Sequence, residues 1–370
     1  MTTTEGSVAT ERSVDNEGSV DYEVVDADGH IELPDGWWQP YLPAKYREWA
    51  PSLQGRGAEG REFTRHWPDP PAPTRNHPGG ADPHARLAAM DLDGVDVAYL
   101  YPSQVLSVMP TLKSSAFALA LAQAYNEWLL DYCSVDPHRL RPVALVPQQD
   151  LVLAVEEMER VAARGVRAVM LRPNPVLDVN IDHPNYERVW AAAQAAELTI
   201  GIHEGAGGLP RGAQAGVDRC HTFSQVHVVC HPFEHMLACL LLLTGGVLER
   251  HPRLRVGFME SGAGWAPFWL NRMDEHWEQP HSGRPTPEPP SFYFVRQCFL
   301  GVEPADHLLP QMLEFGLGDS LVYSSDFPHF DAVWPGSAAA LLDRTDVADA
   351  AKRKVAHDNA LRMYGVTQAV

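Results

Sequence analysis

The stretch Val24-Val25-Asp26-Ala27-Asp28-Gly29-His30 sets the interpretation of the whole chain. Its β-branched pair predicts a buried strand over 24–28, followed by an Asp-x-His pattern. Residues two apart on a strand point to the same face, so Asp28 and His30 should project side by side. One carboxylate and one imidazole at this spacing can supply half of a metal site. A solvated turn after a buried strand is the alternative that this stretch leaves open.

Strands that alternate with helices are predicted along the rest of the chain. Helical spacing of apolar residues is found in 116–132, 151–163 and 185–196. Alternating strands and helices predict a parallel sheet, and eight such units predict a closed but distorted (β/α)8 TIM barrel. An open doubly wound sheet is disfavoured because no GxGxxG follows the first strand. The eight predicted strands are 24–28, 95–101, 142–146, 168–171, 198–203, 254–260, 298–302 and 321–325.

The predicted barrel is a single domain over 22–366, preceded by a polar tail. Residues 1–21 are rich in Ser, Thr, Gly and Glu and predict a disordered acidic tail rather than a signal peptide. The segment 31–86 lacks periodicity and is rich in Pro, Gly and Trp, so we expect an insertion that forms a lid or pocket wall. Trp37, Trp38 and Trp67 of this lid could cover a substrate, or could pack between lid and barrel. A proline-rich surface loop is predicted over 279–292.

Composition restricts the possible partners. A formal net charge of −19 argues against nucleic acid or an anionic membrane surface. No apolar run approaches the roughly 20 residues that span a bilayer. The five cysteines have no CxxC spacing, which favours free thiols and a cytoplasmic location. The apolar helix expected over 233–248 could support a homodimer.

Histidines and carboxylates gather after several predicted strands. Asp28 and His30 follow the first strand, His203 and Glu204 the fifth, Glu260 the sixth, and Asp326 and His329 the eighth. Active sites of such barrels form at the C-terminal ends of the strands, and core packing has no need for these residue types there. The pattern therefore predicts a metal site that takes a small-molecule substrate.

Different roles are expected of the individual residues. His203 and Asp326 are expected to be ligands, whereas Glu260 could be a ligand or a general base. His231 and His329 could act in catalysis, and His231 could also bind metal. The roles of Glu204 and His227 stay open. Pro232 should break the helical run, which would make His235 a surface residue at the start of the next helix, and two further histidines, His251 and His357, are also expected at the surface.

The ensemble of these motifs resembles the amidohydrolase superfamily, and in particular its amidohydrolase 2 branch, which includes decarboxylases. The resemblance rests on Asp28-x-His30, His203, the 246–256 stretch, Glu-Ser-Gly-Ala-Gly-Trp at 260–265 and Ser-Asp-Phe-Pro-His at 325–329. It implies metal ligands at Asp28, His30, His203 and Asp326. Two departures are notable: Glu260 stands where the decarboxylases carry a proton-handling His, and no lysine ends the fourth strand, where binuclear hydrolases carry one.

The Glu-Ser-Gly-x-Gly-Trp variant also resembles a non-heme di-iron monooxygenase of platensimycin-type diterpenoid biosynthesis. That resemblance implies two divalent metal ions, iron before zinc or manganese, held by Asp28, His30, His203, Glu260, Asp326 and His231. The first expectation is therefore an O2-dependent hydroxylation of a bulky apolar substrate. A metal-dependent hydrolase or a decarboxylase is the alternative, with Glu260, His231 and His329 in catalysis. A catalytically inactive scaffold is a third possibility.

Overall fold

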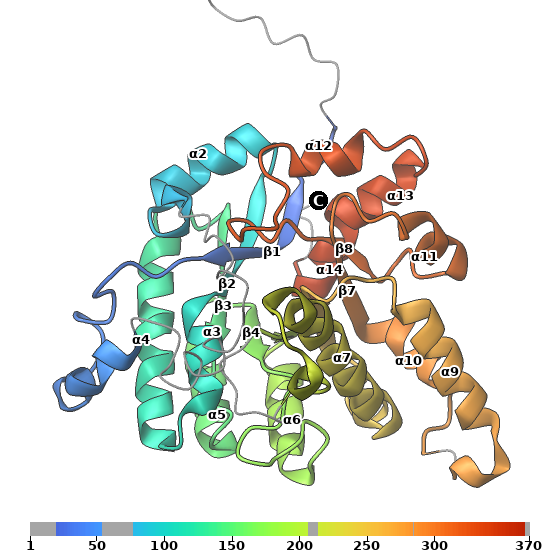
Figure 1. The fold of residues 1–370 in the computed structure, drawn as a ribbon, viewed down its shortest axis with the longest axis horizontal. Helices are drawn as coiled ribbons and strands as arrows, with labels where there is room; N and C mark the ends of the chain where they lie inside the picture. Colours follow the sequence, from blue (N-terminus) through green and yellow to red (C-terminus); the bar gives the residue numbers. More distant parts are fainter. Residues whose placement is uncertain (1–19, 54–76, 206–213, 284, 367–370) are drawn as a thin grey trace, which may run out of the picture.

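Eight parallel strands form one sheet in which the strand order follows the chain order (Figure 1). The computed structural model describes residues 20–53, 77–205, 214–283 and 285–366. The predicted tail over 1–21 therefore lies almost entirely outside the described residues. The strands are β1 (Val25–Ile31), β2 (Val97–Pro102), β3 (Leu140–Leu145), β4 (Ala168–Leu171), β5 (Thr199–His203), β6 (Arg255–Met259), β7 (Cys298–Val302) and β8 (Leu321–Tyr323).

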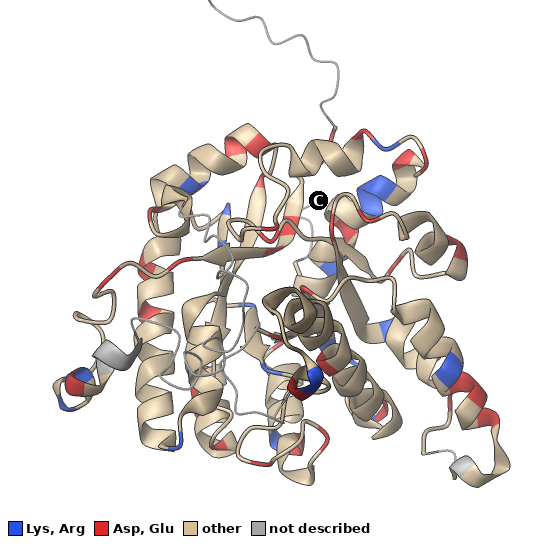
Figure 2. Ribbon diagram, in the orientation of Figure 1, with Lys and Arg blue, Asp and Glu red and all other residues tan. Residues whose placement is uncertain are grey.

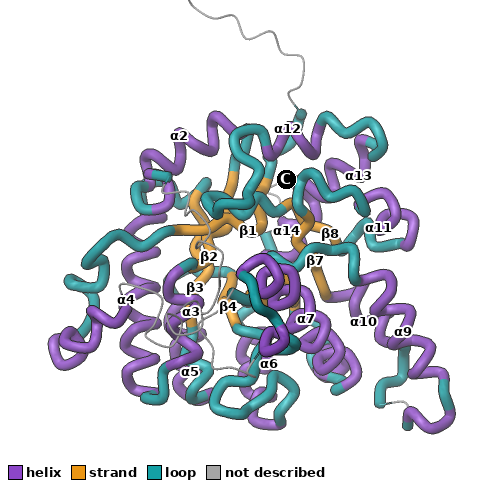
Figure 3. The backbone as a smooth tube through the Cα atoms, in the orientation of Figure 1, coloured by secondary structure: helices purple, strands orange, loops and turns teal. Residues whose placement is uncertain are grey.

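Helices surround these strands, and the predicted (β/α)8 barrel is confirmed (Figure 3). Aspartates cap the N-termini of two of the longer helices: Asp82 accepts from the amides of α2 and Asp150 from those of α5. The α-helices are α2 (Pro83–Asp93), α3 (Gln104–Val108), α4 (Ser115–Cys133), α5 (Leu151–Ala162), α6 (Glu187–Ala195), α7 (Phe223–Thr244), α8 (Val247–Arg250), α9 (Ala266–Glu278), α10 (Pro290–Gln297), α11 (Leu309–Phe315), α12 (Ser337–Leu342), α13 (Asp349–Arg353) and α14 (Asn359–Tyr364). Shorter helical turns are η1 (Ala44–Leu53), η2 (Pro78–Gly80), η3 (Met109–Thr111), η4 (Pro184–Tyr186), η5 (Val217–Arg219), η6 (Pro280–Ser282) and η7 (Lys354–Asp358).

The barrel closes between β1 and the segment that follows β8. The amide of His30 donates to the carbonyl oxygen of Phe327 over 2.7 Å, and the amide of Asp326 donates to that of Asp28 over 3.0 Å. These bonds bring the Asp-x-His segment and the Ser-Asp-Phe-Pro segment side by side. The closure of the fold and the assembly of the predicted site therefore use the same backbone.

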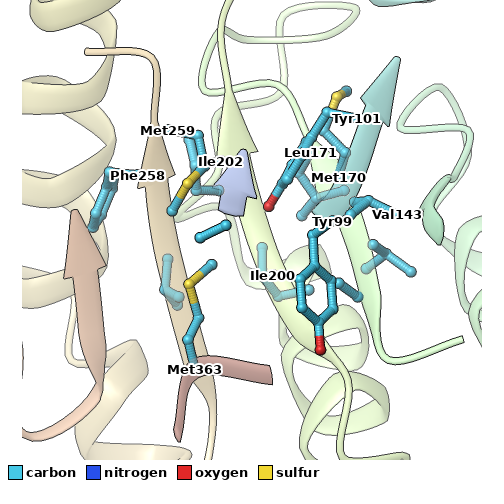
Figure 4. Close-up of a cluster of buried hydrophobic side chains, with 14 of the residues drawn as sticks. Tyr99, Tyr101, Val143, Met170, Leu171, Ile200, Ile202, Phe258, Met259 and Met363 are labelled. Atoms are coloured by element: carbon cyan, nitrogen blue, oxygen red, sulfur yellow. The ribbon is translucent and has the colours of Figure 1, made fainter. Parts of the chain in front are cut away.

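Strand β1 extends three residues beyond the predicted end of the first strand. All seven of its residues are buried, including Asp26, Asp28 and His30. Asp28 and His30 thus lie within a barrel strand rather than in a turn after it. The pairing register of β1 with β2 shifts between Asp26 and Gly29, as in a bulge. Below these polar residues the barrel is filled by apolar side chains, among them Ile202 and Met259 (Figure 4).

Helix α7 contradicts two expectations, because Pro232 does not end it and His235 is not at the surface. Proline removes the amide that would bond to the carbonyl of Val228. Val228 is 72% exposed, so water can satisfy that carbonyl and the helix continues. His235 is fully buried, with its ring nitrogens 2.7 Å from the carbonyl oxygen of His231 and 3.1 Å from that of Ile202. The surface expectation was wrong because this face of α7 packs on the barrel.

The expected surface positions of His251 and His357 are also wrong. Both side chains are buried. The Nε2 atom of His251 lies 2.7 Å from a carboxylate oxygen of Glu187, and the Nδ1 atom of His357 lies 2.8 Å from the carbonyl oxygen of Glu23. Each imidazole therefore has a polar partner that its sequence position did not reveal.

The insertion over 31–86 has more order than its sequence predicted. It contains η1 and η2, and α2 begins within it. Trp37 and Trp38 are buried in the hydrophobic core, with Trp37 against Tyr125 of α4. Both residues thus pack between insertion and barrel rather than over the cavity at the barrel mouth, while Trp67 lies outside the described residues.

The surface and the cysteines agree with an acidic chain that holds free thiols. Acidic residues are spread over many elements (Figure 2), and all five cysteines are unpaired. Within the described ranges, α7 is long and apolar enough to cross a membrane, with a mean hydropathy of 1.6, but half of the apolar window is buried inside the molecule. Buried helices of barrels share that length and composition.

Candidate metal centre

Asp28, His30 and His203 form the deepest group of possible ligands. All three side chains are fully buried. The Nε2 atoms of His30 and His203 each lie 3.5 Å from Oδ1 of Asp28. Strand β1 supplies the first two residues from one face of the strand, and His203 is the last residue of β5. The predicted convergence of these strands on one point is therefore present.

The hydrogen bonds of the two histidines fix how the rings face this point. Nδ1 of His30 lies 3.1 Å from the carbonyl oxygen of Pro102, and Nδ1 of His203 lies 2.7 Å from that of Glu204. A carbonyl can only accept, so both Nδ1 atoms carry the hydrogen and both Nε2 atoms present lone pairs in the neutral rings. This is the arrangement by which metal-binding histidines are oriented in proteins.

Asp326 and His329 extend the group from the segment after β8. Oδ1 of Asp326 lies 3.3 Å from Nε2 of His30 and 2.7 Å from Nδ1 of His329. The ring of His329 is 4.0 Å from that of His30, and its Nε2 is 3.0 Å from the hydroxyl of Ser103. The carboxylate of Asp326 and the imidazole of His329 therefore both lie beside His30.

Glu260 divides its two carboxylate oxygens between two groups of histidines. Oε2 lies 3.5 Å from Nε2 of His203, whereas Oε1 lies 3.6 Å from Nε2 of His231 and 3.9 Å from that of His227. His227, His231 and Glu260 can thus offer three further ligand atoms. His227 was left open by the sequence, and its place one helical turn before His231 was the signal for it.

The backbone at both carboxylates is in the left-handed region. Glu260 has φ +51° and Asp326 has φ +55°. Such φ values are uncommon for residues other than glycine and cost about 1–3 kcal/mol each, so they cluster at functional sites. Here they turn the carboxylates into the barrel mouth just after β6 and β8.

The electrostatics of the centre favour a bound cation. Burial raises the pKa of Glu260 well above its ordinary value, and the carboxylate of Asp326 raises it further. Burial also raises the pKa of Asp326 and lowers those of His30 and His231. Carboxylates crowded together repel one another, and neutral imidazoles do not compensate for them. A divalent ion would stabilise the ionised carboxylates and engage the imidazole lone pairs at the same time.

Several polar atoms of the centre have no hydrogen-bond partner among the described residues. They include Oδ1 of Asp28 and both ring nitrogens of His231, all of them buried. Buried polar atoms in proteins are nearly always paired. Their positions and the mixed carboxylate and imidazole donors fit manganese, iron or zinc. These residues thus fit a group of one or two divalent ions.

Two arginines that sequence reasoning did not select support the centre from outside. Arg86 of α2 is buried and donates through Nη1 to the carbonyl oxygens of His30 (2.8 Å) and Phe327 (3.1 Å). Arg172, directly after β4, pairs with Glu204 over 2.5 Å. Glu204 therefore pairs with Arg172 after β4 and does not face the candidate metal ligands. No pattern in the sequence pointed to Arg172. For Arg86 the one indication was Gly29, between Asp28 and His30, because the guanidinium of Arg86 occupies the space beside that glycine.

A cavity of about 310 Å³ opens above the centre. Its walls come from α7 and from the segments that follow β6, β7 and β8, with Glu260 and Asp326 at its base. Val228, Pro304 and Val333 give it an apolar part, while Glu303 and Asp331 add carboxylates. Within the described part of the chain no lysine or arginine lines this cavity. A substrate carboxylate would therefore depend on the metal for its positive partner.

Comparison with known proteins defines the class to which this fold and site belong. Residues 25–366 match the amidohydrolase family Amidohydro_2, and the chain belongs to that family. The resemblance to its decarboxylase branch is also supported. The chain is 26% identical over 198 residues to a 2-amino-3-carboxymuconate-6-semialdehyde decarboxylase of Dictyostelium discoideum, and this match covers 52% of the chain and 51% of that relative.

Three further comparisons extend over more of the chain. A γ-resorcylate decarboxylase of Rhodococcus jostii is 23% identical over 293 residues, covering 75% of the chain and 86% of that protein. The structure of 5-carboxyvanillate decarboxylase from Sphingomonas paucimobilis superposes with a TM-score of 0.73 at 21% identity, covering 94% and 100% of the two chains. A dihydroxybenzoic acid decarboxylase of Polaromonas with bound manganese and 2-nitroresorcinol superposes with a TM-score of 0.68 at 19% identity, covering 94% and 98%.

These relatives are decarboxylases, and none of them is described as an oxygenase. The expectation that placed a di-iron monooxygenase first is thus not supported at that level of detail, and the alternative reading fits the relatives better. Iron is likewise not indicated, whereas manganese is bound in two of the similar structures.

Proposed function

We propose that the protein is a metal-dependent, non-oxidative decarboxylase of a small hydroxylated aromatic or unsaturated carboxylic acid. The observation that carries the proposal is the position of Glu260, whose carboxyl group lies 3.5 Å from a metal-facing nitrogen of His203 and at the base of the cavity. Removal of CO2 requires a proton donor beside the metal, and Glu260 is placed to be one. The decarboxylases among the relatives support the same reaction class.

The chain's own residues would divide the work as follows. Asp28, His30, His203 and Asp326 would hold a divalent ion, which when bound polarises oxygen atoms of the substrate. Glu260 would hold a proton on its carboxyl group and deliver it to the substrate carbon that carries the leaving carboxylate. The carbon–carbon bond breaks, CO2 leaves, and the proton of Glu260 takes its place on that carbon.

A route for a new proton runs from Glu260 towards solvent. The Nε2 atom of His227 lies 3.9 Å from Oε1 of Glu260 and 3.7 Å from Oδ2 of Asp331. The side chain of His227 is 25% exposed, so it can exchange protons with water. We expect His227 to restore the proton that Glu260 gives up in each turnover.

The test is CO2 release by the manganese- or zinc-loaded protein without oxygen. Candidate substrates are 2,6-dihydroxybenzoate and 5-carboxyvanillate. Decarboxylation in D2O should place one deuterium on the ring, and Glu260→Gln should lower the rate by about 10²–10⁴-fold, as expected for a lost proton donor. Glu278→Gln on the exposed face of α9 is the matched control. A folded, metal-loaded protein that releases no CO2 from a broad panel of such acids would rule the proposal out.

A di-iron monooxygenase is a second candidate, favoured by one specific observation. The two oxygens of Glu260 face separate histidine groups, which is the geometry of a carboxylate shared by two metal ions. Reconstitution with iron(II) should then give about two ions per chain, and His227→Ala with His231→Ala should reduce this to about one. Product formation that consumes O2, with none under anaerobic conditions, would favour this candidate over the decarboxylase.

A further inference from the structure

A second cavity, of about 360 Å³, lies away from the metal centre. It is formed where α4 ends and where β2, β3 and β4 begin, which is the N-terminal end of the barrel. The metal centre and its cavity occupy the C-terminal end. The lining residues are Tyr99, Leu130, Asp131, Cys133, Ser134, Pro137, Leu140, Arg141, Pro142, Arg164, Gly165, Val166 and Arg167. Nothing in the proposed reaction uses this cavity.

The cavity is positively charged in a chain whose net charge is −19. Three arginines and one aspartate line it. Arg164 pairs with Glu127 over 3.0 Å, and the aspartate, Asp131, accepts a hydrogen bond from Tyr41 over 2.7 Å. Arg141 and Arg167, by contrast, form no ion pair within the described residues. Two guanidinium groups at the same cavity therefore have no anionic partner among the residues that the structure describes.

A buried hydroxyl completes the arrangement. Tyr99 of β2 is only 3% exposed, and its ring is stacked 3.3 Å from that of Tyr364, so its position is fixed. Its hydroxyl points away from the arrowheads of the strands, towards the N-terminal end of the barrel (Figure 4). Both Arg141 and Arg167 act electrostatically on this hydroxyl. The hydroxyl, whose pKa burial raises to about 12, stays a neutral donor at physiological pH.

We propose that this cavity is a binding site for a phosphate group, held by the guanidinium groups of Arg141 and Arg167 with Tyr99 as a further donor. Guanidinium groups bind phosphate oxygens in bidentate geometry, and a neutral hydroxyl adds a donor without repelling the anion. A phosphate ion alone would leave much of the cavity empty. The lining of Leu130, Pro137 and Val166 suits the organic part of a phosphate monoester, so we expect a phosphorylated metabolite to bind more tightly than the free ion.

The test is calorimetric titration of the purified full-length protein with inorganic phosphate and, separately, with glycerol 3-phosphate. Sodium chloride keeps the ionic strength constant, because salt screens such contacts. We expect saturable binding of at least one of the two ligands, with a dissociation constant below about 1 mM. Arg141→Gln and Arg167→Gln should each weaken it by about tenfold or more, and the ligand that binds more tightly identifies the source of the phosphate group.

Two controls make the outcome decisive. Arg272→Gln removes a charge from the exposed face of α9, and it should leave the affinity unchanged. Arg167 is itself exposed, so its variant is expected to fold even if the Arg141 variant does not. Binding that is equally strong in Arg167→Gln and in the unaltered protein would overturn the proposal, as would the absence of binding by both ligands. Because the metal ligands are unaltered throughout, this result is independent of whether the protein is a decarboxylase.

Discussion

His30 and His203 face each other across the barrel mouth with their Nε2 atoms 3.1 Å apart. Both rings use Nδ1 to donate to a backbone carbonyl, so in the neutral state two lone pairs point at each other. Burial lowers the pKa of His30 well below its ordinary value, which disfavours a shared proton as the remedy. A cation between the two nitrogens converts this repulsion into coordination. The centre is therefore built for an ion and is strained without one.

Removal of metal should lower the stability of the whole barrel, because the ligands come from β1, β5 and the segments after β6 and β8. A ligand that binds only the folded state at several hundred times its dissociation constant adds about 3–4 kcal/mol. We expect dialysis against a chelator to lower the melting temperature and manganese or zinc to restore it. A His203→Ala variant should show the lower melting temperature with or without metal. Equal melting temperatures of the metal-free and metal-loaded protein would contradict this prediction.

Metal binding should release a proton from Asp326. Burial raises the pKa of Asp326, so in the metal-free protein this carboxyl keeps a proton that a cation must displace. Affinity should therefore rise with pH. The stability of the metal-free protein runs the other way: carboxyls with raised pKa values stabilise the folded state at low pH and lose that contribution as pH rises. Titrations in two buffers of different ionisation enthalpy measure the released protons, and Glu260→Gln should leave their number unchanged, because Glu260 keeps its proton in the proposed reaction.

Asparagine and alanine at position 326 should separate the charge of Asp326 from its backbone conformation. Asparagine tolerates the left-handed φ of +55°, whereas alanine does not, so Asp326→Ala should be about 1 kcal/mol less stable than Asp326→Asn. Both variants should lose metal affinity. Without metal, Asp326→Asn should be at least as stable as the unaltered protein, because burial disfavours the ionised carboxylate and asparagine is neutral at every pH. Urea unfolding of the metal-free proteins gives this order, and a much less stable Asp326→Asn would show that the carboxylate holds the fold by itself.

The barrel could be predicted from the sequence because the alternation of strands and helices is visible locally. The common position of the candidate ligands could be predicted because the C-terminal ends of the parallel strands meet at one end of the barrel. It could not predict which way polar side chains on helices would face. His235 and His231 share α7 with exposed residues such as Val228, and only the packing of α7 decides which histidine reaches Glu260. Arg86 was missed for the same reason, since an arginine in an irregular segment is usually solvated. The candidate reactions were ranked by resemblance to known families, because the spacing of the ligands in the sequence does not determine which reaction is catalysed.

Arg86 should control metal affinity by holding β1 against the segment after β8, since it donates to the carbonyl oxygens of both His30 and Phe327. Its guanidinium occupies the space beside Gly29 that a β-carbon would take, and that β-carbon would also lie 2.8 Å from Oδ2 of Asp26. Gly29→Ala should therefore displace the arginine, and Arg86→Ala should leave the buried carbonyl of His30 without this donor, at about 1–3 kcal/mol, and the carbonyl of Phe327 with the amide of His30 alone. We expect both variants to lose stability and also to bind manganese or zinc more weakly, by about 10–100-fold, as when an outer partner of a metal ligand is lost.

Arg139→Ala is the matched control, because Arg139 also donates to two backbone carbonyls, those of Val95 and Asp96, but before β2 and away from the centre. The Arg139→Ala control should lower the free energy of unfolding without changing metal affinity. If Arg86→Ala behaves in the same way, Arg86 only stabilises the barrel and does not position the ligands.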